Sequence, residues 1–319
     1  FQYNASAASG SGSGSNAGTY NGNGTAWMVK NIRSGSSPSY PTSFTAVGNT
    51  LYFAAQDGTN GQELWKSDGT ASGTVMVKDI NSGSGGGSLS YLTAVGNTLY
   101  FRASDGTNGI ELWKSDGTES GTMMVQDIYS GGGSSLPNFL TLVGNTLYFQ
   151  ASDATNGYEL WALDPANITG LGGGGSGSGS NAGTYNGNGT AWMVKDINTG
   201  TSNNGGSMSA MYLEQDAVMG NEMYFFATDS TNGYELWKSD GTESGTVMVK
   251  DINNGSGSSM PSSSSITGVN SNLHLKAMNN TNTLFFVAND GIHGEELWKT
   301  DGTASGTVMV KDINSANGN

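Results

Sequence analysis

The chain has 319 residues, a formal net charge of −14 and a pI near 4.3, with 51 glycines and 12% charged residues. So acidic a chain lacks the basic patch that neutralises phosphates, which argues against nucleic-acid binding. No apolar run approaches the roughly 20 residues that span a bilayer, so no transmembrane segment is expected. The absence of cysteine excludes disulfides, thiolate metal sites and a cysteine nucleophile. Glycine costs about 1 kcal/mol per helical position, so the composition indicates turns and little helix.

A Gly/Ser-rich segment, residues 1–25, comes first in the chain. It leads into residue 26, where we expect a single domain to begin that extends over 26–319 with a Gly/Ser-rich insertion at 166–190. Residues 10–30 and 175–195 are identical. Stretches of this composition usually serve as flexible linkers. Two identical loops would also present two equivalent surfaces, so a role in assembly stays open.

A repeat fills the rest of the chain. Glu-Leu-Trp occurs five times, with tryptophans at 65, 113, 161, 237 and 298. A Leu/Met-Tyr/Phe-Phe run precedes each motif, and a Met-Val-Lys/Gln-Asp-Ile run follows it. Short aromatic and β-branched segments separated by Asp-Gly, Asn-Gly and Ser-Gly are typical of antiparallel strands. With the short apolar piece ahead of each aromatic run, every repeat predicts four strands.

These strands are apolar on both faces. In residues 51–55, Leu51 and Phe53 lie on one face, whereas Tyr52 and Ala54 lie on the other. A sandwich wets one face of every strand, whereas four-stranded sheets packed face to face around an axis bury both. We therefore predict an all-β fold, a β-propeller of about five four-stranded blades, or six with one incomplete, without significant helix. A linear β-solenoid is the alternative.

One motif resembles a known family. Residues 63–70, Glu-Leu-Trp-Lys-Ser-Asp-Gly-Thr, and the segments that begin at Glu111, Glu235 and Glu296 resemble the ELWxxDGT repeat of secreted and surface proteins. The segment at Glu159 departs from the pattern, because it continues Ala-Leu-Asp-Pro. The resemblance covers most of residues 26–313. It implies extracellular, propeller-like, non-enzymatic modules, and it brings no catalytic residues to this chain.

The residues themselves offer little catalytic chemistry. His274 and His293 belong to no metal-binding motif, and His293 replaces the Asn of a Thr-Asn-Gly turn, so we expect a turn residue there. Sialidases grip a carboxylate with three arginines, whereas this chain has only Arg33 and Arg102. Glycoside hydrolysis needs one carboxylate pair at a defined separation, but here the carboxylates recur in every repeat. We therefore expect no enzyme; a strong asymmetry among the repeats would reopen that question.

The repeated carboxylates admit two roles. One aspartate per repeat opens an Asp-x-x-Asn/His turn, and as carboxylates are ligands of hard cations these residues are weak calcium candidates: Asp57, Asp105, Asp153, Asp229 and Asp290. The alternative, which we favour, is that they accept N–H bonds of their own turns. No other cofactor is expected.

The tryptophans also admit two roles. Aromatic faces stack on sugars and repeated sites give avidity, which suggests a glycan-binding, lectin-like module. Because each tryptophan lies mid-strand beside a leucine, packing between blades is the interpretation we prefer. Six Asn-x-Ser/Thr sequons mark candidate glycosylation sites in exposed loops: Asn4, Asn23, Asn167, Asn188, Asn254 and Asn279.

The strand count leaves one segment over. The sequence has five aromatic runs and five Glu-Leu-Trp motifs but six Met-Val-x-x-Ile runs. The additional run is residues 28–32, which stand alone near the N-terminus. Bare edge strands are rare in proteins. We expect this segment to act as an assembly strand that closes a ring or adds to the next molecule of a filament, with these residues in contact: Trp27, Met28, Val29 and Ile32.

The sequence thus predicts a non-enzymatic structural or adhesive propeller outside the cell or at its surface, part of a filament, sheath or adhesin. Its expected partners are further molecules of the same chain, or other extracellular proteins and glycans. A glycan-binding lectin-like module is the alternative function.

Overall fold

The computed structural model describes residues 27–167, 191–198, 211–229, 231–261, 275–278 and 281–313. The chain divides into two compact units, Phe1–Met124 and Val125–Asn319. Nearly all of the described structure is β-strand and turn, and the one helix in these ranges is the short 3₁₀ helix η1 (Pro165–Asn167). None of the described residues forms a helix long and apolar enough to cross a membrane.

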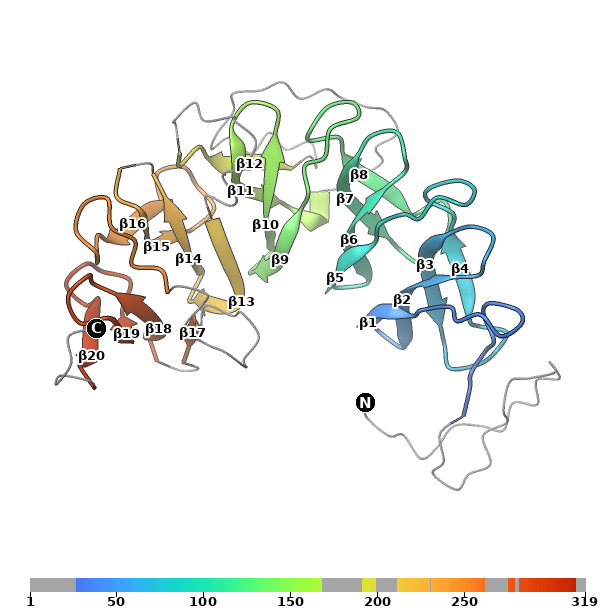
Figure 1. Ribbon diagram of the computed structural model, residues 1–319, viewed down its shortest axis with the longest axis horizontal. Helices are drawn as coiled ribbons and strands as arrows, with labels where there is room; N and C mark the ends of the chain where they lie inside the picture. The colour runs from blue at the N-terminus through green and yellow to red at the C-terminus, as the bar shows by residue number, and fades with distance from the viewer. Residues whose placement is uncertain are drawn as a thin grey trace. The chain divides into compact units, whose positions relative to one another are not determined.

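Two four-stranded sheets begin in the first unit, and we call them blades 1 and 2 (Figure 1). Blade 1 consists of β1 (Thr42–Val47), β2 (Thr50–Gln56), β3 (Gln62–Ser67) and β4 (Val75–Lys78). Blade 2 consists of β5 (Ser90–Val95), β6 (Thr98–Ser104), β7 (Ile110–Ser115) and β8 (Met123–Gln126). The boundary between the two units falls within β8.

The second unit holds blades 3, 4 and 5 (Figure 1). Blade 3 consists of β9 (Asn138–Val143), β10 (Thr146–Asp153), β11 (Gly157–Leu163) and β12 (Trp192–Lys195). Blade 4 consists of β13 (Met211–Met219), β14 (Glu222–Thr228), β15 (Tyr234–Ser239) and β16 (Val247–Lys250). Blade 5 consists of β17 (Lys276–Ala277), β18 (Leu284–Asn289), β19 (Glu295–Thr300) and β20 (Val308–Lys311).

The prediction of an all-β fold with five four-stranded blades is confirmed. In every sheet the four strands follow one another in chain order, and in blade 1 each strand pairs with the next in antiparallel fashion. The aromatic runs form the second strands, the Glu-Leu-Trp motifs the third and the Met-Val runs the fourth. The described residues contain no sixth sheet, and residues 27–32 form no strand, so the strand expected there is absent.

Each blade has two apolar faces, which we call front and back. The front of blade 1 carries Tyr52, Ala54, Leu64 and Val77, and it packs in one core cluster against the back of blade 2. That back consists of Leu99, Phe101, Ala103 and Trp113. Corresponding residues join blade 3 to blade 4 and blade 4 to blade 5. At these three junctions the burial of a blade face, inferred from the alternation of residues 51–55, is therefore realised by the neighbouring blade.

A β-bulge aims one lysine of the fourth strand at the next blade. Leu64 pairs with Lys78 and Trp65 pairs with Met76, so Val77 is an extra residue in β4. The same register shift occurs in blades 3, 4 and 5. A bulge re-aims the side chains beside it, and Lys78 Nζ donates to the carbonyl oxygen of Thr122 in blade 2 at 2.9 Å.

Candidate assembly surfaces

The glutamate of the Glu-Leu-Trp motif is a buried anchor. Glu63 is fully buried, and its carboxylate accepts the backbone N–H groups of Ile80 (2.8 Å) and Asn81 (3.3 Å), which follow β4. Burial raises the pKa of Glu63 to about 7, although these N–H bonds favour the charged form. The equivalent glutamates of blades 3 and 4 accept the corresponding N–H groups. This residue therefore fastens the loop after the fourth strand to the third strand.

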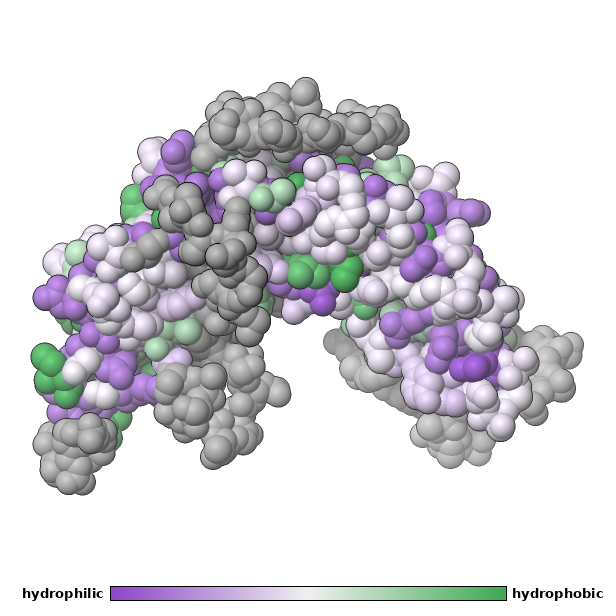
Figure 2. Space-filling model, turned by 45° about the horizontal axis from the view of Figure 1, so that its top comes forward, coloured by the Kyte–Doolittle hydropathy of each residue, from purple (hydrophilic) through white to green (hydrophobic). Residues whose placement is uncertain are grey.

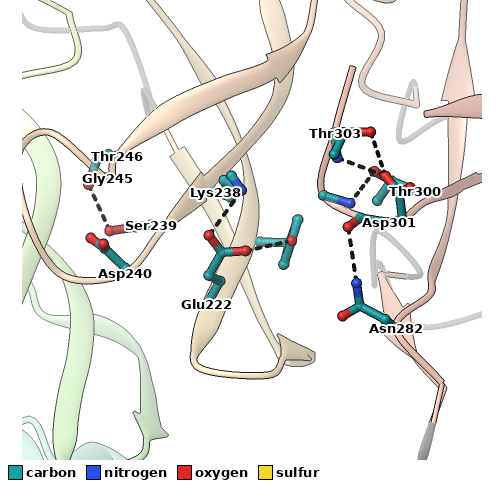
Figure 3. A network of polar contacts seen from close by, with 12 residues as sticks. Glu222, Lys238, Ser239, Asp240, Gly245, Thr246, Asn282, Thr300, Asp301 and Thr303 are labelled. Carbon is teal, nitrogen blue, oxygen red and sulfur yellow. Dashed lines mark hydrogen bonds and ion pairs between the residues drawn. The ribbon is translucent and has the colours of Figure 1, made fainter. Parts of the chain in front are cut away.

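The Asp-Gly-Thr part of the motif forms a closed turn. Asp301 of blade 5 accepts the N–H (2.9 Å) and the hydroxyl (2.7 Å) of Thr303, and Asn282 donates to its backbone carbonyl at 3.4 Å (Figure 3). In blade 4, the hydroxyls of Ser239 and Thr246 lie 2.7 Å apart across the base of the same turn. In blade 1 the side-chain bond from Thr70 is the largest cause that holds the pKa of Asp68 below its ordinary value. The carboxylate is thus occupied within its turn.

The five calcium candidates lie one per blade, each at the turn between the second and third strands. Asp57 accepts the N–H groups of Thr59 (2.8 Å) and Asn60 (2.9 Å), and the Asn60 side chain at 2.8 Å. The backbone bond from Asn60 is the largest cause of the lowered pKa of Asp57. Asp105, Asp153 and Asp229 repeat these contacts. The geometry is that of turn capping.

The fifth candidate uses a histidine in place of the asparagine. Asp290 accepts the backbone N–H of His293 at 2.8 Å and lies 2.7 Å from its Nδ1. The prediction that His293 is a turn residue is confirmed, whereas His274 lies outside the described residues. Over the described ranges, no group of three or more His, Cys, Asp or Glu side chains is arranged to hold a metal ion.

The tryptophans of the motif are buried. Trp113, Trp237 and Trp298 lie in the clusters between neighbouring blades, whereas Trp65 lies beside Ile32 on the back of blade 1. All five are 5–7% exposed, so a sugar ring cannot stack on them. Trp298 belongs to the cluster between blades 4 and 5, where Lys250 Nζ lies 5.8 Å from its ring centroid. The preferred interpretation, packing between blades, is confirmed for Trp113, Trp237 and Trp298.

The candidate assembly strand lies against blade 1 without pairing to it. Ile32 packs beside Phe53 and Trp65 on the back of the blade. Lys30 Nζ donates to the carbonyl oxygen of Thr74 at 2.7 Å, which is the contact that Lys78 makes to blade 2. Trp27 and Met28 are about half exposed. Residues 27–32 therefore lie on blade 1 as the end of a preceding blade would.

The front of blade 5 is open. Leu297, Val310 and Ile313 are 40%, 45% and 75% exposed. Their equivalents in blades 1 to 4 are at most 7% exposed. Figure 2 shows apolar surface, in green, at this end of the molecule on the left of the view. Contiguous exposed apolar surface is a mark of interaction sites, and it makes this face the second candidate for assembly.

Sequence reasoning missed the open face of blade 5 and the paired lysine contacts. The first had no signal within the repeat, because Leu297, Val310 and Ile313 are of the same residue types as their buried equivalents. The lysine contacts had no signal in a single repeat, since they join residues of adjacent repeats. Of the sequons, Asn254 is exposed and Asn167 lies in η1. The other four, Asn4, Asn23, Asn188 and Asn279, lie outside the described residues.

Comparison with known proteins gives no match to a family model and none to a curated protein sequence. Three similar solved structures are a protein assigned as TolB from Agrobacterium tumefaciens (9% identity, TM-score 0.37), a puromycin hydrolase (10%, 0.41) and prolyl oligopeptidase B from Galerina marginata (11%, 0.39). The matches cover 86%, 88% and 82% of this chain, and 82%, 40% and 32% of those chains. The chain thus spans less than half the length of the two enzymes. Likeness at these TM-scores carries no argument about activity.

Proposed function

We propose that the protein is a non-enzymatic structural or adhesive module that builds or decorates an extracellular assembly. The observation that carries this proposal is the open apolar front of blade 5, where Leu297, Val310 and Ile313 are exposed. In blades 1, 3 and 4 this face is the surface through which one repeat binds the next. An exposed apolar face of this kind is typical of interaction sites.

The repeated carboxylates support a non-enzymatic role. Glu63 anchors a loop, Asp57 and Asp68 cap turns, and their equivalents make the same contacts in other blades. An active site needs a singular constellation in which one repeat differs from the rest. The motif of blade 3 departs from the others in sequence, but its aspartate has the same kind of role. Asp164 caps the helix η1, where its carboxylate accepts the backbone N–H of Ala166 at 2.9 Å.

The extracellular placement rests on the resemblance of residues 63–70 to ELWxxDGT repeats. Exposure of Asn254, in a loop after β16, agrees with a glycosylation site there. We propose further molecules of this chain, or extracellular proteins and glycans, as partners, and no cofactor. Calcium at the Asp57-type turns is left to the binding test given below.

Purified full-length chain tests this function. Electron microscopy and light scattering over a concentration series should show ordered assemblies, and binding to whole cells or extracellular matrix should be saturable. A chain that stays monomeric, binds no cell or matrix preparation and hydrolyses a peptide or glycoside substrate would overturn the proposal.

A glycan-binding module is the second candidate, and it is favoured by one observation. Tyr40, Phe44 and Tyr91 on or beside the first strands of blades 1 and 2 are 59%, 58% and 41% exposed. Tyr40 and Tyr91 have positive φ angles, 46° and 54°, and such strained residues cluster at binding sites. The Arg102 guanidinium lies 4.7 Å from the Tyr91 ring centroid. Specific binding on a glycan array, lost in Tyr91→Ala and kept in Ile292→Ala, a substitution at a 75% exposed residue outside this group, would favour this candidate over the structural one.

A further inference from the structure

The blade junction has a fixed set of contacts that recurs inside both units. A tyrosine hydroxyl of the giving blade fills the space where a Cβ would lie on a glycine of the receiving blade: Tyr52 on Gly117, Tyr148 on Gly241 and Tyr224 on Gly302. A lysine of the giving blade donates to a threonine carbonyl of the receiving blade: Lys78 to Thr122, Lys195 to Thr246 and Lys250 to Thr307, at 2.8–2.9 Å. The junction is therefore recognisable by its parts.

Blade 5 carries the apolar part and the lysine of the giving half, and no described residue covers them. Phe285 stands at the tyrosine position, and Lys311 stands at the lysine position. Lys311 is exposed, and its Nζ donates to no carbonyl oxygen of the described residues. The apolar part of the giving face, with Leu297 and Ile313, is exposed as well.

Blade 1 carries the receiving half, and it is only partly filled. Among the residues that the structure describes, none comes within 4 Å of the Cβ position on Gly69, which corresponds to Gly117 of blade 2. The receiving carbonyl of Thr74 is occupied by Lys30 of the same chain, and Ile32 covers part of the back face. Residues 27–32 thus fill the lysine position and leave the glycine position open.

The apolar parts of the two halves match an existing junction, although Phe285 lacks the hydroxyl that fills the glycine position in the other junctions. The back of blade 1 presents Leu51, Phe53, Ala55 and Trp65. Blade 5 presents the same four residue types, Leu284, Phe286, Ala288 and Trp298, to the front of blade 4. In blade 4, Leu236, Val249 and Ile252 pack against the back of blade 5. The back of blade 1 offers the same kind of surface to the equivalent residues of blade 5, Leu297, Val310 and Ile313.

We propose that the front of blade 5 binds the back of blade 1 of a second molecule, and that residues 27–32 are a placeholder that this docking displaces. The inference rests on the proposed structural function and names its partner as another molecule of the same chain. Such a head-to-tail contact uses different surfaces on the two molecules, so it continues into a filament or closes into a ring of molecules.

Displacement follows from the area that each occupant covers. Of the described residues 27–32, Ile32 is the one that joins the cluster on the back of blade 1, and Leu51 and Met76 stay only half-buried beneath it. A docked blade brings several apolar side chains, as blade 1 itself does against blade 2. Because stabilisation grows with the apolar area removed from water, the blade outcompetes the segment once the concentration of the chain is high enough.

Sedimentation equilibrium of the full chain and three variants tests this proposal. Val310→Asp places a charge at the centre of the docking face, on a side chain already 45% exposed, and should weaken association by about tenfold or more. Val247→Asp is the matched control. Val247 remains 37% exposed although the front of blade 4 is covered, so it lies outside the junction and its substitution should leave association unchanged. Lys30→Ala combined with Ile32→Ser removes the placeholder and should strengthen association severalfold.

Several results would overturn the proposal. Equal association of Val310→Asp and the parent chain would show that the front of blade 5 makes no contact. Weaker association of the Lys30→Ala, Ile32→Ser variant would show that residues 27–32 themselves bind the partner. A chain that stays monomeric at every concentration, with thermal melting confirming that all variants fold, would also refute it. Ordered assemblies that persist in Val310→Asp would overturn this inference and leave the proposed function standing.

Discussion

Blades 4 and 5 have almost the same sequence in their third and fourth strands, but the front of blade 4 is buried and the front of blade 5 is exposed. Leu236, Val249 and Ile252 of blade 4 are 0%, 6% and 7% exposed, whereas their equivalents in blade 5 are 40%, 45% and 75% exposed. Internal contacts of the two blades agree, including the turn bonds of Asp240 and Asp301. The comparison teaches that the repeat determines the blade, whereas the neighbouring blade determines whether its front is core or surface.

The largest expected difference between the blades concerns the leucine of the motif. Leu236→Ala leaves a cavity in the cluster between blades 4 and 5 and should lower the free energy of unfolding by about 3 kcal/mol. Leu297→Ala removes a side chain that is already partly in water, so it should cost less than about 1 kcal/mol. Urea unfolding followed by tryptophan fluorescence measures both. Equal losses would mean that the front of blade 5 is covered in the isolated chain.

The buried glutamates should make stability depend on pH. Burial, with a smaller contribution from the nearby Asp251, raises the pKa of Glu235 from 4.5 to about 7, although the hydrogen bonds from Ile252, Ser259 and Asn253 act in the opposite direction. Because the folded pKa lies above the unfolded one, the stabilisation is complete below about pH 4.5 and is lost as the pH rises to about 7. Burial likewise raises the pKa of Glu159, to about 8.

The urea concentration at the midpoint of unfolding should therefore decrease as the pH is raised from 5 to 8. Glu235→Gln keeps the shape of the side chain and removes its titration, so the fall should be smaller in that variant. A parent chain whose stability rises with pH over this range would contradict the account of these carboxyl groups.

The turn aspartates should give equal effects in the two blades. Asp240 and Asp301 each accept the N–H and the hydroxyl of the threonine two residues on, at 2.9 and 2.7 Å. Asp240→Ala and Asp301→Ala should each cost about 1 kcal/mol, the usual loss for such bonds, since neither turn depends on the next blade. Differential scanning calorimetry of the two variants would expose any dependence on position.

The smallest expected effect is that of calcium. Asp229 and Asp290 already accept two backbone N–H groups and one side-chain group each. If their role is turn capping, millimolar calcium or a chelator should leave the melting temperature unchanged. A rise with calcium, as mass action requires of a ligand of the folded state, would instead assign these turns to cation binding.

Much of the fold was predictable from local sequence, because the strands and turns of each blade are set by residues within one repeat. The alternation of Leu51, Tyr52 and Phe53 correctly predicted two buried faces. The leftover segment was not predictable in the same way. Residues 28–32 match the fourth strands in sequence, but a strand needs a partner strand, and the described chain offers residues 27–32 only the back of blade 1. Pairing between repeats, such as Lys30 with Thr74, depends on packing that no single repeat encodes.

Hydroxyl-radical footprinting over a concentration series tests the central claim most directly, because it reports the exposure of each side chain. At low concentration, Leu297 and Ile313 should be oxidised much faster than Leu236 and Ile252. As the concentration rises, oxidation of Leu297 and Ile313 should fall to the level of the buried pair, while that of the exposed Val247 of blade 4, outside the junction, should not change. Oxidation of Leu297 and Ile313 that stays fast at all concentrations would contradict the claim that this face is a binding surface for a second molecule.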